Sequence, residues 1–309
     1  MAHIASAEIR LTEQRNPASE EIDRLTPLEI VEVINREDQR VAPAVFREKE
    51  AIARAIELAE ASFRRGGRLI YVGAGTSGRL GVLDASEMPP TYGTDPEMVQ
   101  GIIAGGYEAL TRAQEGAEDH PEDGAAAIDE REVGANDFVL GIATSGTTPY
   151  VHGALGRAKE RGATTGFLLC THPAPEHYEK YDVVIAALVG PEVVTGSTRM
   201  KAGTATKLVL NTISTGVMIR LGKVYGNLMV DLQVTCQKLQ DRGERIVAEM
   251  LELDREEARH LLDCAGGSVK TAIAMYWTGA GPEDARQQLR AAGGRLGEIL
   301  ERYRVADGG

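Results

Sequence analysis

Five short apolar runs, each followed by a loop and a stretch of helical character, most constrain how this chain can fold. They are Leu69–Val72, Val99–Ala104, Phe138–Ala143, Gly166–Cys170 and Val183–Val189. Runs that are apolar on both faces and separated by helices are typical of parallel strands covered on both sides. The pattern predicts an α/β fold whose core, over roughly residues 59–222, is a doubly wound five-stranded parallel sheet.

Helical spacing of apolar residues flanks the predicted sheet on both sides. It predicts helices over residues 27–38 and 44–64 before the sheet, and a long apolar helix over Thr204–Leu221. Several short helices should follow, with starts at Asp254, Ser268 and Pro282. We therefore expect an N-terminal helical segment, a sheet domain and a C-terminal helical domain, over residues 1–58, 59–222 and 223–309.

Charge and composition exclude several classes of partner. The chain has 309 residues and a formal net charge of -12, whereas nucleic-acid binding depends on a basic surface. No apolar run approaches the ~20 residues that span a bilayer, and residues 1–17 lack the apolar core of a signal peptide. Three distant cysteines predict neither a disulfide framework nor a metal site. We expect a cytoplasmic protein without a nucleic-acid or membrane partner.

Loops rich in Gly, Ser and Thr follow the first, third and fifth predicted strands, at residues 73–79, 144–149 and 190–199. The carboxyl ends of parallel strands share one edge of a sheet, so these loops should lie together. Their backbone N–H groups, hydroxyls and following helix N-termini suit an anion. The first loop superficially matches a dinucleotide fingerprint, but the acidic residue expected ~20 positions later is not convincingly placed. The loops favour a small phosphorylated ligand.

The sequence of residues 190–204, GPEVVTGSTRMKAGT, carries a resemblance to a known family. It resembles a signature shared by the glucokinase regulatory protein group and the N-acetylmuramic acid 6-phosphate etherases, which are built on the sugar isomerase domain. Further stretches similar to the etherases are 15–17, 22–25, 34–38, 73–90, 115–119 and 222–231. Two positions depart from the family pattern, with Met88 in place of Cys and Thr147 in place of Arg.

The resemblance implies cleavage of the ether between carbon 3 of N-acetylmuramic acid 6-phosphate and its D-lactyl group, with no cofactor. The reaction removes the carbon 2 proton of the open-chain aldehyde, expels lactate and adds water. It needs two acid/base groups, and carboxyls with tuned pKa values serve this purpose. Glu87 and Glu118 match the family's catalytic carboxylates. Glu87 is expected to protonate lactate, and Glu118 to abstract the proton.

The three loops supply the residues expected to bind the sugar phosphate. These are Gly75, Thr76, Ser77, Ser145, Gly146, Thr147, Thr148, Glu192, Ser197, Arg199 and Lys201. Arg199 and Lys201 are candidates for anchoring phosphate or the lactyl carboxylate, with salt bridges to nearby acids as the alternative. Four histidines lack metal-ligand spacing, and we expect surface roles for His120, His152, His172 and His177.

The position of Glu87 raises a geometric question. The sequence Met88-Pro89-Pro90 is expected to end any helix that contains Glu87. A straight helix from Ser77 would nevertheless put Glu87 about 15 Å from the phosphate end. Either that helix is short, or Glu87 completes a site on a second subunit. We expect a homodimer with its sites at or near the interface, because the apolar helix over Thr204–Leu221 also needs covering.

Two other functions remain open at this stage. A non-catalytic sugar-phosphate sensor of the glucokinase regulatory protein type would share the 190–203 signature, but would not need a carboxylate pair. An aldose–ketose isomerase on the same fold would need a base at carbon 2, but no acid directed at carbon 3. Glu87 and Glu118 favour the etherase.

Overall fold

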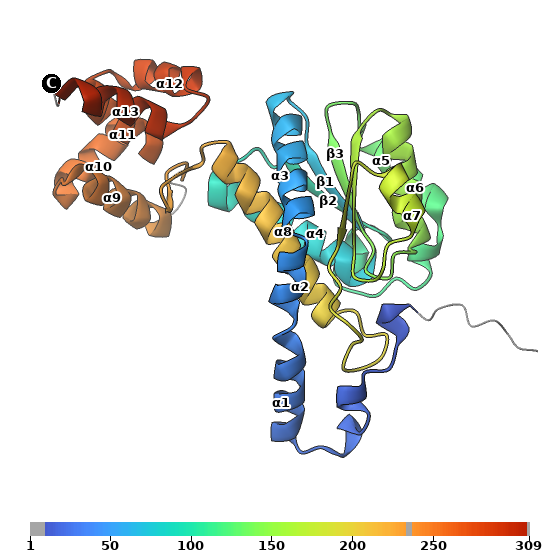
Figure 1. The fold of residues 1–309 in the computed structure, drawn as a ribbon. Coiled ribbons are helices and arrows are strands. Elements are labelled where there is room, and N and C mark those ends of the chain that lie inside the picture. Colours follow the sequence, from blue (N-terminus) through green and yellow to red (C-terminus); the bar gives the residue numbers. More distant parts are fainter. Residues whose placement is uncertain (1–9, 233–236, 308–309) are drawn as a thin grey trace, which may run out of the picture. The chain divides into compact units, whose positions relative to one another are not determined.

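The five apolar runs form one parallel sheet with the strand order β2-β1-β3-β4-β5 (Figure 1). Its strands are β1 (Leu69–Gly73), β2 (Val99–Ile103), β3 (Phe138–Ile142), β4 (Thr164–Leu169) and β5 (Val183–Ala186). The computed structural model describes residues 10–232 and 237–307. The prediction of a doubly wound five-stranded α/β core is confirmed. Strand β5 ends at Ala186, although its apolar run continues buried to Val189.

The chain reverses its direction across the sheet at β1. Residue Leu69 of β1 pairs with Val99 of β2 on one side and with Phe138 of β3 on the other. The connecting helices therefore cover opposite faces (Figure 1). One face carries α3 (Lys49–Arg64), α4 (Gly75–Tyr92) and α8 (Lys201–Arg220); the other carries α5 (Pro121–Glu130), α6 (Pro149–Glu160) and α7 (Pro175–Lys180). In such a sheet, ligands bind at the carboxyl ends of the strands flanking the reversal.

Alternate residues of β1 enter two different environments. Ile70 and Val72 join the apolar core shared with α5 and α6, where they are fully buried. Tyr71 faces the other way, and its hydroxyl donates to Asp84 of α4 at 3.0 Å. Ser214 of α8 donates to the other oxygen of Asp84 at 3.3 Å. The buried Asp84 carboxylate thus connects β1, α4 and α8.

Helix α4 is longer than the sequence suggested. It continues without interruption from Gly75 to Tyr92, with Pro89 and Pro90 inside its last turn. The expectation that these prolines end the helix is wrong. Met88 and Tyr92 are both buried on that turn, so tertiary burial outweighs the backbone hydrogen bonds that the prolines cannot donate.

The N-terminal segment consists of short 3-10 turns followed by helices. Its elements are η1 (Leu11–Glu13), η2 (Pro17–Ser19), η3 (Ile22–Arg24), α1 (Pro27–Asp38) and α2 (Val41–Arg47). Thr26 and Glu29 form a capping box at the start of α1. The helix predicted over residues 44–64 is broken at Glu48, between α2 and α3. The Glu48 carboxylate accepts from the Ala186 backbone N–H at 3.0 Å, which ties this break to β5.

Residues 87–95 and 215–309 form a second compact unit. It contains a two-stranded antiparallel ribbon and five helices among the described residues. These are β6 (Val224–Tyr225), β7 (Leu228–Met229), α9 (Gln237–Leu251), α10 (Arg255–Cys264), α11 (Val269–Thr278), α12 (Pro282–Ala291) and α13 (Leu296–Asp307). The predicted starts are confirmed, because Asp254 and Ser268 cap α10 and α11, and Pro282 opens α12.

The limits 1–58, 59–222 and 223–309 stay a prediction for the folding domains.

Over the described residues, no helix combines the length and apolar character that crossing a membrane requires.

A buried carboxylate on α9 anchors α10. Glu244 accepts from Arg259 Nε at 2.8 Å and from Arg255 Nε at 3.1 Å. Hydrogen bonds from Arg259, Gln240 and Arg255 lower the pKa of Glu244 to about 2, against the opposing effect of burial. Because its unfolded pKa is about 4.3, this carboxylate stabilises the fold above that pH, and the contribution is lost as the pH falls towards 2.

Glu244→Gln is therefore expected to lower the free energy of unfolding by about 2 kcal/mol near pH 7, since two guanidinium groups lose a charged acceptor. Urea denaturation followed by circular dichroism measures the loss. The difference from wild type should shrink steadily between about pH 4 and pH 2. Glu249→Gln, an exposed change on the same helix, is the control and should have little effect. A pH-independent difference would contradict this account of Glu244.

Candidate functional site

The loop between β1 and α4 is built from glycines that allow a close turn. A Cβ on Gly73 would lie 2.7 Å from the backbone nitrogen of Gly78, and one on Gly78 would lie 2.6 Å from Ile103. Gly75 has a left-handed φ of +53°. These three positions let the strand turn directly into the helix, whose N-terminus is the kind of site that suits an anion. Ser77, predicted to bind substrate, is buried in the first turn of α4.

Glu118 lies beside this loop. It belongs to the 3-10 turn η5 (Ala117–Asp119) and is exposed. Together with Gly75 and Arg79 it lines a cavity of about 170 Å³. Arg79 is held in place by a hydrogen bond from its Nε to the Leu110 carbonyl at 3.1 Å. The structure thus brings one predicted catalytic carboxylate next to the predicted anion-binding loop, with a guanidinium in the same cavity.

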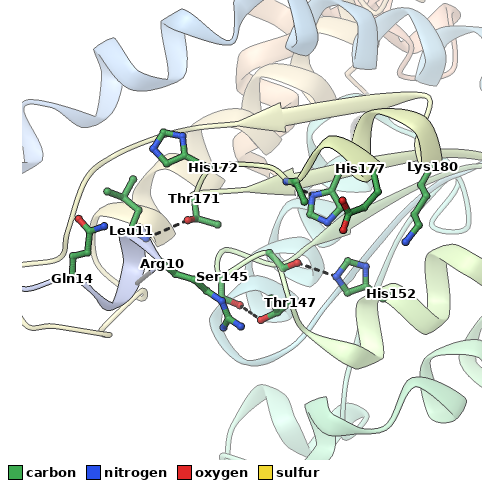
Figure 2. A pocket seen from close by; sticks show the side chains of 13 residues that line it. Arg10, Leu11, Gln14, Ser145, Thr147, His152, Thr171, His172, His177 and Lys180 are labelled. Atoms are coloured by element: carbon green, nitrogen blue, oxygen red, sulfur yellow. Dashed lines mark hydrogen bonds between the residues drawn. The ribbon is translucent and has the colours of Figure 1, made fainter. Parts of the chain in front are cut away.

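The loop between β3 and α6 lines a second, larger cavity of about 630 Å³ (Figure 2). Ser145, Gly146 and Thr147 all contribute to its wall. The hydroxyls of Ser145 and Thr147 lie 3.3 Å apart, and Figure 2 shows the Arg10 side chain near them. The same wall carries further basic or titratable side chains, namely His152, His172, His177 and Lys180.

Thr148 occupies the N-cap position of α6, and its side chain makes no capping hydrogen bond. Its hydroxyl is thus not engaged by the helix that it precedes. An unused hydroxyl next to a helix N-terminus is suited to an anionic ligand.

Two residues predicted to bind substrate, Glu192 of the third loop and Lys201 just after it, are buried and already form hydrogen bonds within the protein. Lys201 is 1% exposed, and its Nζ donates to Glu37 of α1 at 2.6 Å. The Glu192 carboxylate accepts from the backbone N–H groups of Lys201 and Ala202 at 3.0 and 2.9 Å, which caps α8. Burial raises the pKa of Glu192. For Lys201 the structure therefore shows the salt bridge, while direct contacts of either residue to substrate stay predictions.

Burial alone would raise the pKa of Glu37, but hydrogen bonds from Lys201 and Asn16 outweigh it, and the pKa is lowered. Asn16 bridges two elements, donating to Glu37 at 2.8 Å and to the Pro191 carbonyl at 3.0 Å. Ser19 donates to the Val193 carbonyl at 2.8 Å. The N-terminal segment is thus fastened to the third loop.

The third loop also approaches the first. A Cβ placed on Gly203, near the start of α8, would lie 3.5 Å from Cγ2 of Thr76. Ser197 is half-buried in this loop, whereas Arg199 is exposed. The structure therefore brings Thr76 next to the start of α8, and leaves Arg199 exposed to solvent.

Glu87 lies in a different kind of position from the other predicted site residues. It is exposed on α4, ten residues beyond Ser77. Because α4 is one unbroken helix, the alternative of a short helix is wrong, and about 15 Å of helix separates the two residues. Glu87 cannot reach the first turn of α4 from its own helix.

His152, which was expected at the surface, has a structural role beside the site. His152 is half-buried on α6, and both ring nitrogens are engaged, with Gly146 O and Tyr181 OH each at 2.9 Å. The surface expectation for His152 is wrong, because it packs against the ring of Phe167 at 5.2 Å between centroids. Its position one turn inside α6, just after the Gly/Ser/Thr loop, is the signal that could have identified it. His120 and His172 are exposed as expected, whereas His177 is half-buried against the ring of Phe167, so its surface expectation is wrong as well.

Comparison with known proteins gives consistent matches. Residues 51–159 match the family model of the glucokinase regulatory protein N-terminal SIS domain. The chain is 56% identical over 292 residues to an N-acetylmuramic acid 6-phosphate etherase of Gloeobacter violaceus, covering 94% of this chain and 95% of the relative. It is 56% identical to an etherase of the same name from Synechococcus elongatus, covering 93% of each chain, and 51% identical to one from Rippkaea orientalis, covering 96% of each.

Breaking the Glu37–Lys201 pair tests how the third loop is held. Lys201→Met should lower the free energy of unfolding by about 3 kcal/mol or more, because the Glu37 carboxylate loses its buried cation and keeps only the exposed Arg40 as an ionic partner, at 3.4 Å. Thermal or urea unfolding measures the loss. In the double variant Glu37→Gln, Lys201→Met the stranded charge is gone, so much of the stability should return. If the double variant is as unstable as the single one, the stranded charge is not the cause.

Proposed function

The chain belongs to the N-acetylmuramic acid 6-phosphate etherase family, and we propose that it is a carbon–oxygen lyase acting on N-acetylmuramic acid 6-phosphate. The products are N-acetylglucosamine 6-phosphate and D-lactate, which places the enzyme in cell-wall amino sugar recycling or catabolism. The observation that carries the proposal is 56% identity over 94% of the chain to an etherase. Glu118 beside the Gly75 loop supports it, since a sensor has no need of a carboxylate there. A phosphorylated substrate favours the cytoplasm as the compartment.

The proposed reaction is an elimination followed by hydration. Glu118 removes the carbon 2 proton of the open-chain aldehyde, whose carbonyl acidifies it. The carbon 3–oxygen bond breaks, and Glu87 protonates the departing lactate oxygen. Water then adds its hydroxyl to carbon 3 and a proton to carbon 2. General acid and base groups of this kind each contribute about 10²- to 10⁴-fold to the rate.

The phosphate is assigned to the crevice between β1 and β3. Residues Thr76 and Ser77 supply hydroxyls from the first loop, and Ser145, Thr147 and Thr148 supply them from the second. Gly75 and Gly146 let the backbone approach the anion. The proposed set is completed by four residues at or just after the third loop, namely Glu192, Ser197, Arg199 and Lys201. Glu192 and Lys201 contribute by holding the shape of that loop.

The reaction itself is the first test. Incubation with N-acetylmuramic acid 6-phosphate should release D-lactate, which is assayed enzymatically. In ¹⁸O-labelled water, the label should enter carbon 3 of the sugar and not the lactate, because elimination breaks the bond on the sugar side. Glu118→Gln and Glu87→Gln should each lower turnover by about 100-fold or more. Asp119→Asn, a neighbouring exposed change, is the control.

A sensor or an aldose–ketose isomerase would release no lactate. Label in the lactate would exclude elimination, and normal turnover by either glutamine variant would remove that glutamate from the mechanism.

We also propose that the enzyme is a homodimer whose sites combine residues of two subunits. The length of α4 supports this arrangement, because Glu87 lies about 15 Å along the helix from Ser77. A twofold interface would let Glu87 of one subunit approach the crevice of the other. Leu83, 44% exposed one turn before Glu87, is an apolar residue that such an interface would cover.

Mixing two inactive variants tests shared sites directly. Glu87→Gln and Glu118→Gln proteins, unfolded together and refolded, should form mixed dimers in which one of the two sites has both carboxylates. Random pairing makes about half of the dimers mixed, so activity should recover to about a quarter of wild type. Sedimentation equilibrium checks that dimers form. Activity that stays at the level of the separate variants, or an active monomer, would defeat the shared site.

A further inference from the structure

The carbonyl of Gly146 is held by a side chain that has no place in the reaction. His152 Nε2 lies 2.9 Å from Gly146 O (Figure 2). A carbonyl oxygen can only accept, so Nε2 carries the proton and donates. Gly146 itself adopts a left-handed φ of +79°, and its N–H donates to the Ala143 carbonyl at 2.8 Å. The turn is thereby fixed at both of its peptide bonds.

The second nitrogen of His152 is fixed by Tyr181. With the proton on Nε2, the neutral ring accepts at Nδ1, and the Tyr181 hydroxyl donates to it at 2.9 Å. Burial raises the pKa of Tyr181 to about 12, so this hydroxyl keeps its proton at neutral pH. Phe167 and His177 lie against the imidazole, with ring centroids 5.2 and 5.8 Å away. The two hydrogen bonds fix the tautomer of His152, and the ring contacts constrain the orientation of its imidazole.

Holding the Gly146 carbonyl also orients the next amide. In a trans peptide the C=O and the following N–H point in opposite directions. The Thr147 N–H therefore points away from His152. Among the described residues, no acceptor is hydrogen-bonded to the backbone N–H of Thr147. The loop presents this donor next to the Ser145 and Thr147 hydroxyls, where an anion could accept it.

We propose that His152 is a positioning residue for phosphosugar binding, which fixes the Gly146–Thr147 peptide so that its N–H is directed at the substrate's anionic group. The inference rests on the proposed function for its ligand. His152 acts through the loop and touches no reacting atom. Its loss should therefore weaken substrate binding with little effect on the chemical step.

Three variants separate the hydrogen bond from the packing. His152→Leu keeps apolar bulk but removes the donor. His152→Gln retains an N–H group at about the reach of Nε2. Tyr181→Phe keeps the second ring and removes only the hydroxyl that fixes the tautomer. His260→Leu, an exposed change on α10 in the second unit, is the matched control.

The full-length protein is titrated with N-acetylglucosamine 6-phosphate by calorimetry, and kcat and KM are measured with N-acetylmuramic acid 6-phosphate. We expect His152→Leu to raise Kd and KM about 10-fold or more, with kcat within about threefold of wild type. His152→Gln should stay within about threefold of wild type, Tyr181→Phe should lie between them, and His260→Leu should match wild type.

An unchanged Kd for His152→Leu would overturn the proposal, as would equal losses for the Leu and Gln variants. If His152→Leu does not fold, Tyr181→Phe decides, and an unchanged Kd there counts against it. A wild type that binds the phosphosugar but releases no lactate would refute the etherase function alone, and the ratio of Kd values would still test His152. A wild type that binds no phosphosugar would overturn both.

Discussion

The reversal of chain direction at β1 is the constraint on which the site depends. Because β1 pairs with β2 on one side and β3 on the other, α4 leaves towards one face while α5 and α6 cover the opposite one. The loops after β1 and β3 are then separated by no crossing helix, so both lie at the carboxyl edge of the sheet beside the reversal. The third Gly/Ser/Thr-rich loop follows β5 of the same sheet.

Buried polar contacts attach the third loop to this frame. Glu192 of the loop, Lys201 just after it and Glu37 of α1 are all buried, and each buried charge requires a partner. Glu37 meets Lys201, and Glu192 meets the first amides of α8. Asn16 joins the N-terminal segment to the Pro191 carbonyl. A loop held by several directional bonds has one geometry, which suits the binding of an anion at its edge better than a mobile loop would.

The two carboxylates proposed as acid and base lie in very different places. Glu118 is on a short turn and lines a cavity with Gly75 and Arg79. Glu87 lies ten residues along α4 from Ser77, and the stiffness of a continuous helix prevents that stretch from folding back. The proposed homodimer would bring Glu87 to the site of a second subunit, and the exposed Leu83 near Glu87 is an apolar residue that its interface would cover.

The sequence by itself determined the sheet, the position of the Gly/Ser/Thr loops, and the caps at Thr26, Asp254 and Ser268, because these depend on periodicity and on chemistry within a few residues. Only the tertiary structure decided which polar side chains form hydrogen bonds or salt bridges within the protein. Lys201 and Glu37 are 164 residues apart, so no local pattern pairs them. The sequence alone predicted a surface position for His152. In the structure it packs against Phe167 of β4 and is hydrogen-bonded to Tyr181. Pro89 and Pro90 lie inside α4 although proline disfavours a helix interior. The burial of Met88 and Tyr92 on the same turn outweighs this local propensity.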